Sequence, residues 1–508
     1  MIQDTLRIRC IRPGEPPPNI GDFDSLRASF CWSDAKRGLA GLPGGGLNIA
    51  YEALDRWVDQ GDGERLAMHF IGRDWRRKDY SYDRLSGLAN RFANTLEGLG
   101  IESGDCVCTL ARRVPELYAT LFGALKFGAV VCPLSSSFRP DEVQSRLEVG
   151  QARVLVTTLS LYRRTVESAR ERLPKLEFVL LTDARGEALP PGTLSYAELM
   201  DGADEDWSIP PTDPESPALL HFARVNSGRP RGVVHVHAAV IAHYATGLYA
   251  LDLHPDDIYW CTIDPGWVTG IAYGAIAPLV NGASLVVDPE PFEAERWYRI
   301  LQEEGVNVWY TTPAAIHRLM EQGNALATSY CYNKLRHMAS VGEPLDPDCV
   351  VWGKEIFALP FHDTWSQTET GGIMIANFRG EEIRPGAMGR PVPGVEAAIV
   401  SVSRPGKGGA VEIEVITEPD REGELALRAG WPSMFRGYVG DKARYRRCFA
   451  GEWYLSGDRA KRDADGWFWY LGRAEDAAAD EKRPGSRTVS RVLMEQPTEA
   501  VRPGGARA

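Results

Sequence analysis

Short apolar, β-rich runs alternate with longer segments of helical period along most of the chain, and no other feature limits the fold as strongly. The alternation predicts strands at 107–110, 154–158, 178–182, 284–287 and 306–312, and helices at 85–99, 115–127 and 293–304. A chain that alternates strands with helices pairs its strands mainly in parallel. The expected fold class is therefore α/β.

The pattern changes after Gly389, where strand candidates at 395–402, 411–416 and 423–428 follow one another between Gly/Pro turns. This predicts a β-rich, barrel-like subdomain over about 388–473, inside one large domain that spans 46–473. The Pro- and Gly-rich residues 1–45 are expected to be irregular. Residues 474–508 are polar apart from one apolar patch, so we expect them to form no core of their own and to be poorly ordered.

The 508 residues are 44% hydrophobic and 25% charged, the composition of an ordinary soluble globular protein. A net charge of -12 without a basic stripe argues against nucleic acid as the main partner. Nine cysteines without a CxxC pair fit neither a disulfide framework nor a zinc pattern, and Cys106 and Cys108 are expected to be buried strand residues. With no signal peptide and no long apolar run, we expect a cytoplasmic protein that does not bind a membrane.

The first motif is a Gly- and Arg-containing stretch between two apolar runs, residues 221–237. Such loops hold phosphates through backbone N–H groups and cationic side chains, although a surface turn has the same composition. His235 and His237 at its end, together with His243 shortly after it, suggest metal ligands. Histidines that alternate along an apolar strand more often pack or form hydrogen bonds, so both interpretations stay open.

The second motif joins residues 341–344 to residues 363–372, a Gly-bounded turn rich in hydroxyls and carboxylates. Those groups suit an adenine or ribose face and a divalent cation at Glu369; a helix start capped by Thr368 or Thr370 is the alternative. In the third motif, Asp465-Gly466 between apolar runs predicts a hairpin. Asp458 and Arg473 flank this hairpin and could bring an acceptor and a cation to one ligand.

In this order and spacing the three motifs, with residues 264–270 and 309–313, resemble the AMP-forming acyl-CoA synthetases, most closely the acetyl-CoA synthetases. The resemblance runs from about Tyr51 to Asp476. It implies two mixed or parallel sheets flanked by helices, as in the large domain of adenylate-forming enzymes. It also implies an acid–thiol ligase that activates a small carboxylic acid with Mg-ATP to an acyl-adenylate and then transfers the acyl group to coenzyme A. ATP or AMP, Mg²⁺ and coenzyme A are the implied cofactors.

The resemblance also implies a role for each motif residue. Those at adenine would be Gly342, Glu343 and Pro344 on one side and Asp363, Thr364 and Trp365 on the other. Thr368 at the α-phosphate and Glu369 as the magnesium ligand would be catalytic. Asp458 would contact the ribose hydroxyls, and Arg473 would also hold the nucleotide. The phosphates would be contacted by the loop residues Ser227, Gly228 and Arg231.

The acyl pocket would be lined by Trp267, Val268, Thr269, Val341 and Ser366. Where the acetate enzymes close the pocket with a second tryptophan, this chain has Ser366. A hydroxymethyl group in place of an indole leaves room for several more carbons. We therefore expect a short- to medium-chain carboxylate that is longer than acetate.

Two departures from the family pattern bear on turnover. The phosphate loop of the family reads Thr-Ser-Gly-Thr-Thr-Gly-x-Pro-Lys-Gly, whereas residues 223–232 place Val225 at the first glycine and Arg231 at the lysine. A β-branched residue lacks the conformational freedom of glycine, so a mobile phosphate cradle is expected to be compromised. The family also continues past the hinge into a lid domain that carries a lysine; we expect that lid to be largely missing here, with 474–508 as its remnant.

Three interpretations therefore remain open. The first is a working ligase, slowed by about 10²–10³-fold or more if a lid donor is lost, whose lid is supplied by a partner chain. The second is a non-catalytic relative that binds AMP, an acyl-adenylate or an acyl-CoA as a regulatory module. The third is a frameshifted gene product whose tail is accidental. A homodimer is also left open.

Overall fold

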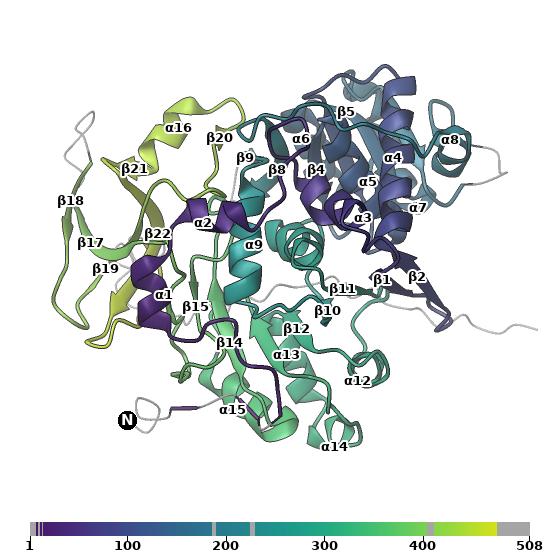
Figure 1. Ribbon diagram of the computed structural model, residues 1–508. Coiled ribbons are helices and arrows are strands. Elements are labelled where there is room, and N and C mark those ends of the chain that lie inside the picture. Colours follow the sequence, from purple (N-terminus) through teal and green to yellow (C-terminus); the bar gives the residue numbers. More distant parts are fainter. Residues whose placement is uncertain are drawn as a thin grey trace, which may run out of the picture.

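The computed structural model describes residues 7–8, 11–12, 14–184, 189–223, 229–403 and 411–474. Two large sheets are layered with helices, and a third, antiparallel sheet lies beside them at the left of Figure 1. The α/β class expected from the alternation of runs is confirmed. Among the described residues, no helix is long and apolar enough to cross a bilayer.

The helices alternate with the strands through most of the chain. Their bounds are α1 (Phe23–Ser29), α2 (Trp32–Arg37), α3 (Arg56–Asp59), α4 (Tyr82–Gly98), α5 (Pro115–Phe127), α6 (Pro140–Gly150), α7 (Leu159–Thr165), α8 (Tyr196–Gly202), α9 (Ala239–Tyr249), α10 (Val268–Ile271), α11 (Ala277–Val280), α12 (Ala294–Glu303), α13 (Pro313–Glu321), α14 (Asn324–Ala327), α15 (Pro347–Phe357) and α16 (Lys442–Arg447). Short π-helical segments at Tyr51–Asp55 and Ala272–Ile276 and a 3₁₀ helix at Glu167–Arg172 complete the helical set.

The first large sheet has nine strands in the order β16-β15-β14-β13-β12-β10-β11-β1-β2. Its strands are β1 (Leu66–Ile71), β2 (Arg77–Ser81), β10 (Ile258–Cys261), β11 (Ser284–Val287), β12 (Val308–Thr311), β13 (His337–Ser340), β14 (Phe361–Trp365), β15 (Ile375–Ala376) and β16 (Arg390–Pro391). The strands from β1 to β14 in that order pair in parallel, and β2, β15 and β16 pair antiparallel at the two edges.

The second large sheet has eight strands in the order β20-β9-β8-β4-β3-β5-β6-β7. Its strands are β3 (Cys106–Leu110), β4 (Val130–Leu134), β5 (Ala152–Thr157), β6 (Phe178–Leu181), β7 (Leu194–Ser195), β8 (Pro217–Ala223), β9 (Arg231–Val236) and β20 (Gly437–Tyr438). The pairs β8–β9 and β9–β20 are antiparallel, and the other described pairs of this sheet are parallel. Because β20 comes from the β-rich segment, that segment reaches across to the second large sheet.

The antiparallel sheet occupies the β-rich segment expected after Gly389. Its strands are β17 (Ala397–Ser403), β18 (Glu412–Val415), β19 (Glu422–Arg428), β21 (Phe449–Ala450), β22 (Trp453–Arg462) and β23 (Phe468–Arg473). They follow the order β18-β17-β19-β22-β21, with β23 on β22. All five pairings are antiparallel, and three of them, β17–β18, β21–β22 and β22–β23, join strands that follow one another in the chain.

Three apolar layers explain why the central strands read as continuous apolar runs. The largest layer lies between the two big sheets and includes Val107 of β3 and Tyr310 of β12. A second covers the outer face of the nine-stranded sheet, and a third the outer face of the eight-stranded sheet. Alternate residues of each central strand enter different layers: Trp309 belongs to the second and Cys108 to the third. Strands buried on both faces require apolar residues at every position.

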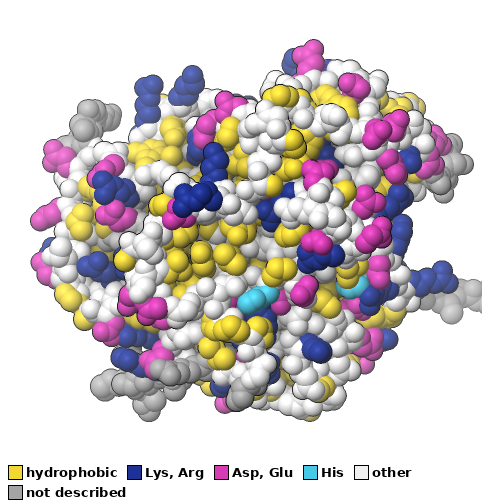
Figure 2. Space-filling view, viewed as in Figure 1, with side chains coloured by type: hydrophobic (Ala, Val, Ile, Leu, Met, Phe, Trp, Pro, Cys, Tyr) yellow, Lys and Arg dark blue, Asp and Glu magenta, His cyan; other side chains and the backbone are white. Residues whose placement is uncertain are grey.

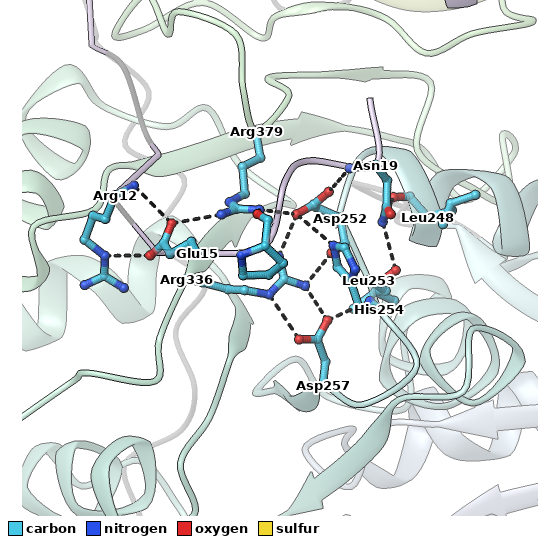
Figure 3. A network of polar contacts seen from close by, with 11 residues as sticks. Arg12, Glu15, Asn19, Leu248, Asp252, Leu253, His254, Asp257, Arg336 and Arg379 are labelled. Atoms are coloured by element: carbon cyan, nitrogen blue, oxygen red, sulfur yellow. Dashed lines mark hydrogen bonds and ion pairs between the residues drawn. The ribbon is translucent and has the colours of Figure 1, made fainter. Parts of the chain in front are cut away.

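The N-terminal stretch differs from the irregular segment that its Pro and Gly content predicted. It forms α1 and α2, and the Asp22 side chain caps α1 by accepting a hydrogen bond from Ser25 N. The residues before α1 are tied down by a buried polar network (Figure 3). In it Arg379 contacts Asp252 and Glu15 at 2.8 Å each, and Arg336 Nη1 contacts Asp252 Oδ2 at 2.6 Å. This network fixes the N-terminal stretch against the nine-stranded sheet.

The surface and the thiols agree with the composition. Basic and acidic side chains are interspersed over the face shown in Figure 2. Cys106 and Cys108 are buried in β3, as expected, and Cys132 of β4 packs beside them in the third apolar layer. All cysteines in the described ranges are free thiols.

Candidate functional site

The second motif lies where the parallel strands β12, β13 and β14 end. Thr311, Ser340 and Asp363 are neighbours in register, and residues 341–344 and 364–372 follow directly after them. Carboxyl ends of neighbouring parallel strands meet at one edge of a sheet, where open α/β sheets bind their ligands. The fold therefore places this motif at a binding edge.

Asp363, expected at adenine, is a buried carboxyl whose Oδ1 has no hydrogen-bond partner among the described residues. Burial raises the pKa of this carboxyl well above its usual range, against backbone hydrogen bonds from Thr364 and Leu345. Gly342 lies two residues after Ser340, the neighbour of Asp363 in register; it has a φ of +98° and open space where a Cβ would stand. A buried polar atom without a partner is one that a ligand would satisfy.

Thr364 and Trp365 are held in place by their own contacts. The Thr364 hydroxyl lies 2.8 Å from Ser340 O and 2.7 Å from the Tyr310 hydroxyl. The Trp365 indole N–H donates to Asp458 Oδ2 at 3.0 Å. Trp365 therefore connects the second motif to the third.

The third motif forms the expected hairpin, with β22 and β23 joined at Gly466 in a left-handed conformation (φ +86°). Asp458 and Arg473 face each other across it, and Arg473 Nη1 lies 2.8 Å from Asp458 Oδ1. The Asp458 side chain is only 4% exposed, whereas that of Arg473 is 51% exposed. The hairpin thus presents a buried carboxylate with a cation at its rim.

Gln367 also holds Asp458, and sequence reasoning missed it. Its Nε2 donates to Asp458 Oδ2 at 3.0 Å, and its Oε1 accepts from the Tyr454 hydroxyl at 2.8 Å. Burial raises the pKa of Asp458, while Arg473, Trp365 and Gln367 oppose that rise. No local pattern marks Gln367, because its partners lie 87 and 91 residues away.

Residues 367–371 form a hydrogen-bonded turn rather than a capped helix start. Thr370 Oγ1 accepts from Gln367 N at 2.9 Å, and Gly371 N donates to Thr368 O at 3.2 Å. Glu369 Oε1 accepts from the Tyr438 hydroxyl at 2.7 Å. Burial and the charge of Glu369 raise the pKa of Tyr438, so this phenol stays protonated and keeps donating. Tyr438 is a second residue that the sequence did not reveal.

The carbonyl groups of this turn accept hydrogen bonds from outside it. Thr368 O lies 2.9 Å from His235 Nε2, Glu369 O accepts from Phe435 N at 3.0 Å, Thr370 O accepts from Trp431 Nε1 at 2.9 Å and Ser433 Oγ at 2.8 Å, and Gly371 O lies 2.8 Å from His243 Nε2. These donors belong to β9, α9 and the segment between β19 and β20.

The histidines of the first motif are therefore hydrogen-bonding residues. His237 Nδ1 accepts from Ile49 N at 3.1 Å, and burial lowers the pKa of His237 to about 3. Burial also lowers the pKa of His235 and of His243 to about 4. In the described part of the chain, the group with metal-site spacing is Cys106, Cys108 and Cys132, not these histidines.

Comparison with known proteins agrees with the motifs. The model of the AMP-binding enzyme family matches residues 54–439. The chain is 38% identical to acetyl-coenzyme A synthetase of Bacillus subtilis (strain 168) over 501 residues, which cover 97% of this chain and 84% of that protein. It is 33% identical to acetyl-coenzyme A synthetase of Deinococcus radiodurans, over 89% of this chain and 72% of that protein.

A solved structure extends this agreement to the fold. The crystal structure of Brucella canis acyl-CoA synthetase superposes with a TM-score of 0.80 at 29% identity, covering 89% of this chain and 80% of that one. The chain belongs to the AMP-forming acyl-CoA synthetase family.

Within this synthetase family, the expected acyl residues come from three places in the fold. Trp267 precedes α10 and Val268 and Thr269 begin it, Val341 follows β13, and Ser366 follows β14. Trp267 packs edge-on against Phe138, with ring centroids 5.9 Å apart. Val341 and Thr269 are buried, whereas Ser366 is partly exposed.

The departures from the synthetase pattern fall largely outside the described residues. Val225, Ser227 and Gly228 of the phosphate loop lie in the stretch 224–228, outside the described ranges, and so do all residues of the expected lid remnant 474–508 except residue 474. Arg231 is described: it begins β9 and pairs with Ala223 of β8.

Proposed function

We propose that the protein is an AMP-forming acyl-CoA ligase that activates a carboxylate longer than acetate. The observation that carries the nucleotide site is that two buried carboxyl groups, Asp363 of β14 and Asp458 of β22, are connected through Trp365, which lies two residues after Asp363 and donates to Asp458. Asp458 is fixed by Trp365, Gln367 and Arg473, and Asp363 keeps one oxygen without a partner. A carboxylate that is held rigidly and a second that lacks a donor suit a ribose and an adenine.

The chain's own residues would act on the nucleotide as follows. Gly342, Glu343 and Pro344 would line adenine opposite Asp363, and Asp458 would accept from the ribose hydroxyls. The Thr368 hydroxyl would donate to the α-phosphate, next to the charge of Arg473. Arg231 would face the outer phosphates. Donors fixed in advance favour the charge that develops when the carboxylate attacks the α-phosphate and pyrophosphate leaves.

Glu369 would hold the magnesium ion. The ion prefers one or two carboxylates together with phosphate oxygens, and Glu369 supplies one carboxylate oriented by Tyr438. When bound, the ion neutralises phosphate charge. Coenzyme A would then take the acyl group from the adenylate through its thiol.

Carboxylate-dependent exchange of pyrophosphate into ATP tests adenylation directly. We expect exchange by the native chain and a loss of about 10–100-fold in Asp458→Asn, because a charged hydrogen-bond acceptor is removed. Asp465→Asn is the matched control, since Asp465 lies at the exposed hairpin turn and contacts Arg384 instead. Native-like exchange by Asp458→Asn would contradict the assignment of the ribose site.

A second candidate function is a binding module without turnover. Val225 at the family's first loop glycine and Arg231 at its lysine favour it, because both changes affect the phosphates rather than the nucleoside. Tight binding of an acyl-AMP sulfamate without any pyrophosphate exchange would select this candidate. Absence of both would exclude both functions.

Ser366 makes the chain-length proposal testable. We expect hexanoyl- and butyryl-AMP sulfamates to bind more tightly than acetyl-AMP sulfamate, by up to about 0.8 kcal/mol for each buried methylene. Ser366→Trp should reverse that order, and Ser366→Ala should keep it. A native chain that binds acetyl-AMP sulfamate most tightly would exclude the longer carboxylate.

A further inference from the structure

In the turn that carries Thr368 and Glu369, the backbone carbonyls are held from outside the turn, in addition to the side-chain hydrogen bonds of Gln367, Glu369 and Thr370. Each carbonyl from residue 368 to residue 371 contacts a donor from outside the turn. We call these outside groups the carbonyl clasp: His235, His243, Trp431, Ser433 and the backbone N–H of Phe435. A turn whose carbonyls are held by outside donors keeps its backbone fixed, so the Thr368 hydroxyl can be directed toward a ligand.

His235 is the central member of the clasp. Its Nδ1 lies 3.0 Å from Ser433 O and its Nε2 lies 2.9 Å from Thr368 O, yet a neutral imidazole has only one N–H to donate. Both acceptors therefore compete for one proton, and the tautomer decides which carbonyl is held. The ring is 1% exposed, so water does not replace the missing donor.

Gly371 makes room for this arrangement. It has a φ of +65°, and a Cβ there would lie 2.7 Å from His235 Nδ1 and 2.3 Å from Ser433 O. Only a residue without a side chain lets the imidazole reach past the turn to Thr368. The close approach of His235 is therefore built into the motif.

We propose that His235 and His243 are positioning residues of the nucleotide site, which hold Thr368 O and Gly371 O through Nε2–H so that the Thr368 hydroxyl and the Glu369 carboxylate meet the α-phosphate and its metal ion. The proposal rests on the proposed function. It assigns His235 to the Nε2–H tautomer. It also separates two parts of the site, because the clasp holds the phosphate-facing turn and contacts neither Asp363 nor Asp458.

Two pairs of variants test the proposal through the position of the donor. A glutamine amide reaches about as far as imidazole Nε2, whereas an asparagine amide reaches about as far as Nδ1. His235→Gln should therefore keep the bond to Thr368 O, and His235→Asn should lose it. His243→Gln and His243→Asn form the same pair at Gly371 O. His237→Gln is the matched control, because His237, directly after β9, is equally buried but bonds Ile49 instead of the turn.

The readout is the ratio of the dissociation constants for adenosine and AMP, measured by calorimetry with Mg²⁺ present. Adenosine reports adenine and ribose contacts, and the ratio isolates the phosphate contact. We expect the asparagine variants to lower the advantage of AMP about fivefold to tenfold, and the glutamine variants and His237→Gln to keep it within about twofold. Adenosine affinity should stay unchanged in all five.

The outcomes separate the inference from the proposed function. If the native chain binds neither AMP nor adenosine, the proposed function fails and the inference with it. If the native chain prefers AMP and the asparagine and glutamine variants keep the same ratio, the inference alone is overturned, because packing of a buried ring would be its only role. If one asparagine variant does not fold, the pair at the other histidine still decides the question.

Discussion

The two ends of strands β13 and β14 are secured by opposite chemistry. At the amino end, Arg336 and Arg379 are buried against Asp252, Asp257 and Glu15 in a network of full charges (Figure 3). At the carboxyl end, the carbonyl clasp holds the turn at 367–371 with imidazole, indole, hydroxyl and amide donors that carry no charge. The same two strands thus end in an ionic network on one side and a neutral one on the other.

The comparison shows where charged groups support the fold and where they remain at the ligand-binding edge. At the amino end the ions face one another. Against the effect of burial, the hydrogen bond from His254 and the charge of Arg336 hold the pKa of Asp252 below its usual range. Such a network fixes the N-terminal stretch in place. Its charged groups pair with one another rather than with a ligand. At the carboxyl end the charges of Glu369 and Arg473 stay near the ligand-binding edge, because neutral groups hold the backbone.

The largest effect is expected at low pH, which should weaken the carbonyl clasp and leave the ionic network at the amino end unchanged. Burial lowers the pKa of His235 and of His243 to about 4, so their folded pKa lies below the unfolded value of about 6.5. Their contribution is fully present above about pH 6.5 and is lost as the pH falls to about 4, at about 1.4 kcal/mol per pH unit for each ring. Asp252 keeps its charge throughout this range.

The measurement is urea unfolding at pH 7 and at pH 4.5. The doubly substituted chain His235→Gln/His243→Gln should lose less free energy of unfolding between the two pH values than the native chain does. Arg379→Met should show the native pH dependence from a lower starting value. Equal pH dependence in the native and doubly substituted chains would refute the assignment of this loss to the clasp.

Removing one charge should damage the amino end more than any other single substitution proposed here. Arg379→Met leaves Asp252 and Glu15 buried with fewer partners, and we expect the free energy of unfolding to fall by about 3–5 kcal/mol. Arg428→Met is the control, because Arg428 pairs with Glu396 and Glu452 on the surface and should cost less than about 1 kcal/mol. Similar losses in the two variants would show that burial of the network does not matter.

Adding a methyl group at Gly371 should destabilise the turn at the carboxyl end of β14. Gly371→Ala places a Cβ against Ser433 O and His235 at a positive φ, and we expect a cost of about 2–4 kcal/mol. Gly342→Ala has a similar φ but meets open space, so its cost should be only about 1–2 kcal/mol. Thermal and urea unfolding of the two variants compare them. A larger loss at Gly342 would contradict the close approach of His235.

The smallest effect is expected at Asp363, and it runs in the opposite direction with pH. Burial raises its folded pKa above the unfolded value of about 3.9, so its contribution is present below about pH 3.9 and is lost as the pH rises. Asp363→Asn does not titrate and should gain about 1 kcal/mol over the native chain between pH 4 and pH 5. Parallel unfolding curves at the two pH values would rule out a raised pKa.

The regular elements could be predicted closely because local pattern decides them. The strand expected at 284–287 is β11, and the helix expected at 115–127 is α5, which starts at Pro115 and ends before Gly128 in a left-handed conformation. Proline at the first turn and glycine after the last are local signals. The helices α1 and α2 were missed, although Asp22 offered a cap, because proline and glycine around them predict irregular chain.

In the candidate site, only residues singled out by the sequence motifs could be predicted. The Asp465-Gly466 turn predicted a hairpin that Asp458 and Arg473 flank, and in the structure these two residues pair across it. Gln367 and Tyr438 were not found, because hydrogen bonding to Asp458 and Glu369 depends on segments far apart in the chain. The spacing of His235 and His243 did not reveal their carbonyl partners for the same reason.

By itself, the sequence determined the α/β class, the family and the residue types at the binding edge, because periodicity, turn residues and short motifs act over a few neighbouring positions. Only the tertiary structure decided that charges secure one end of β13 and β14 and neutral donors the other. That outcome depends on which distant segments become neighbours when the strands align. Burial then sets the protonation of His235 and Asp363, and the neighbours His254 and Arg336 keep Asp252 ionised; a linear chain has neither burial nor these neighbours.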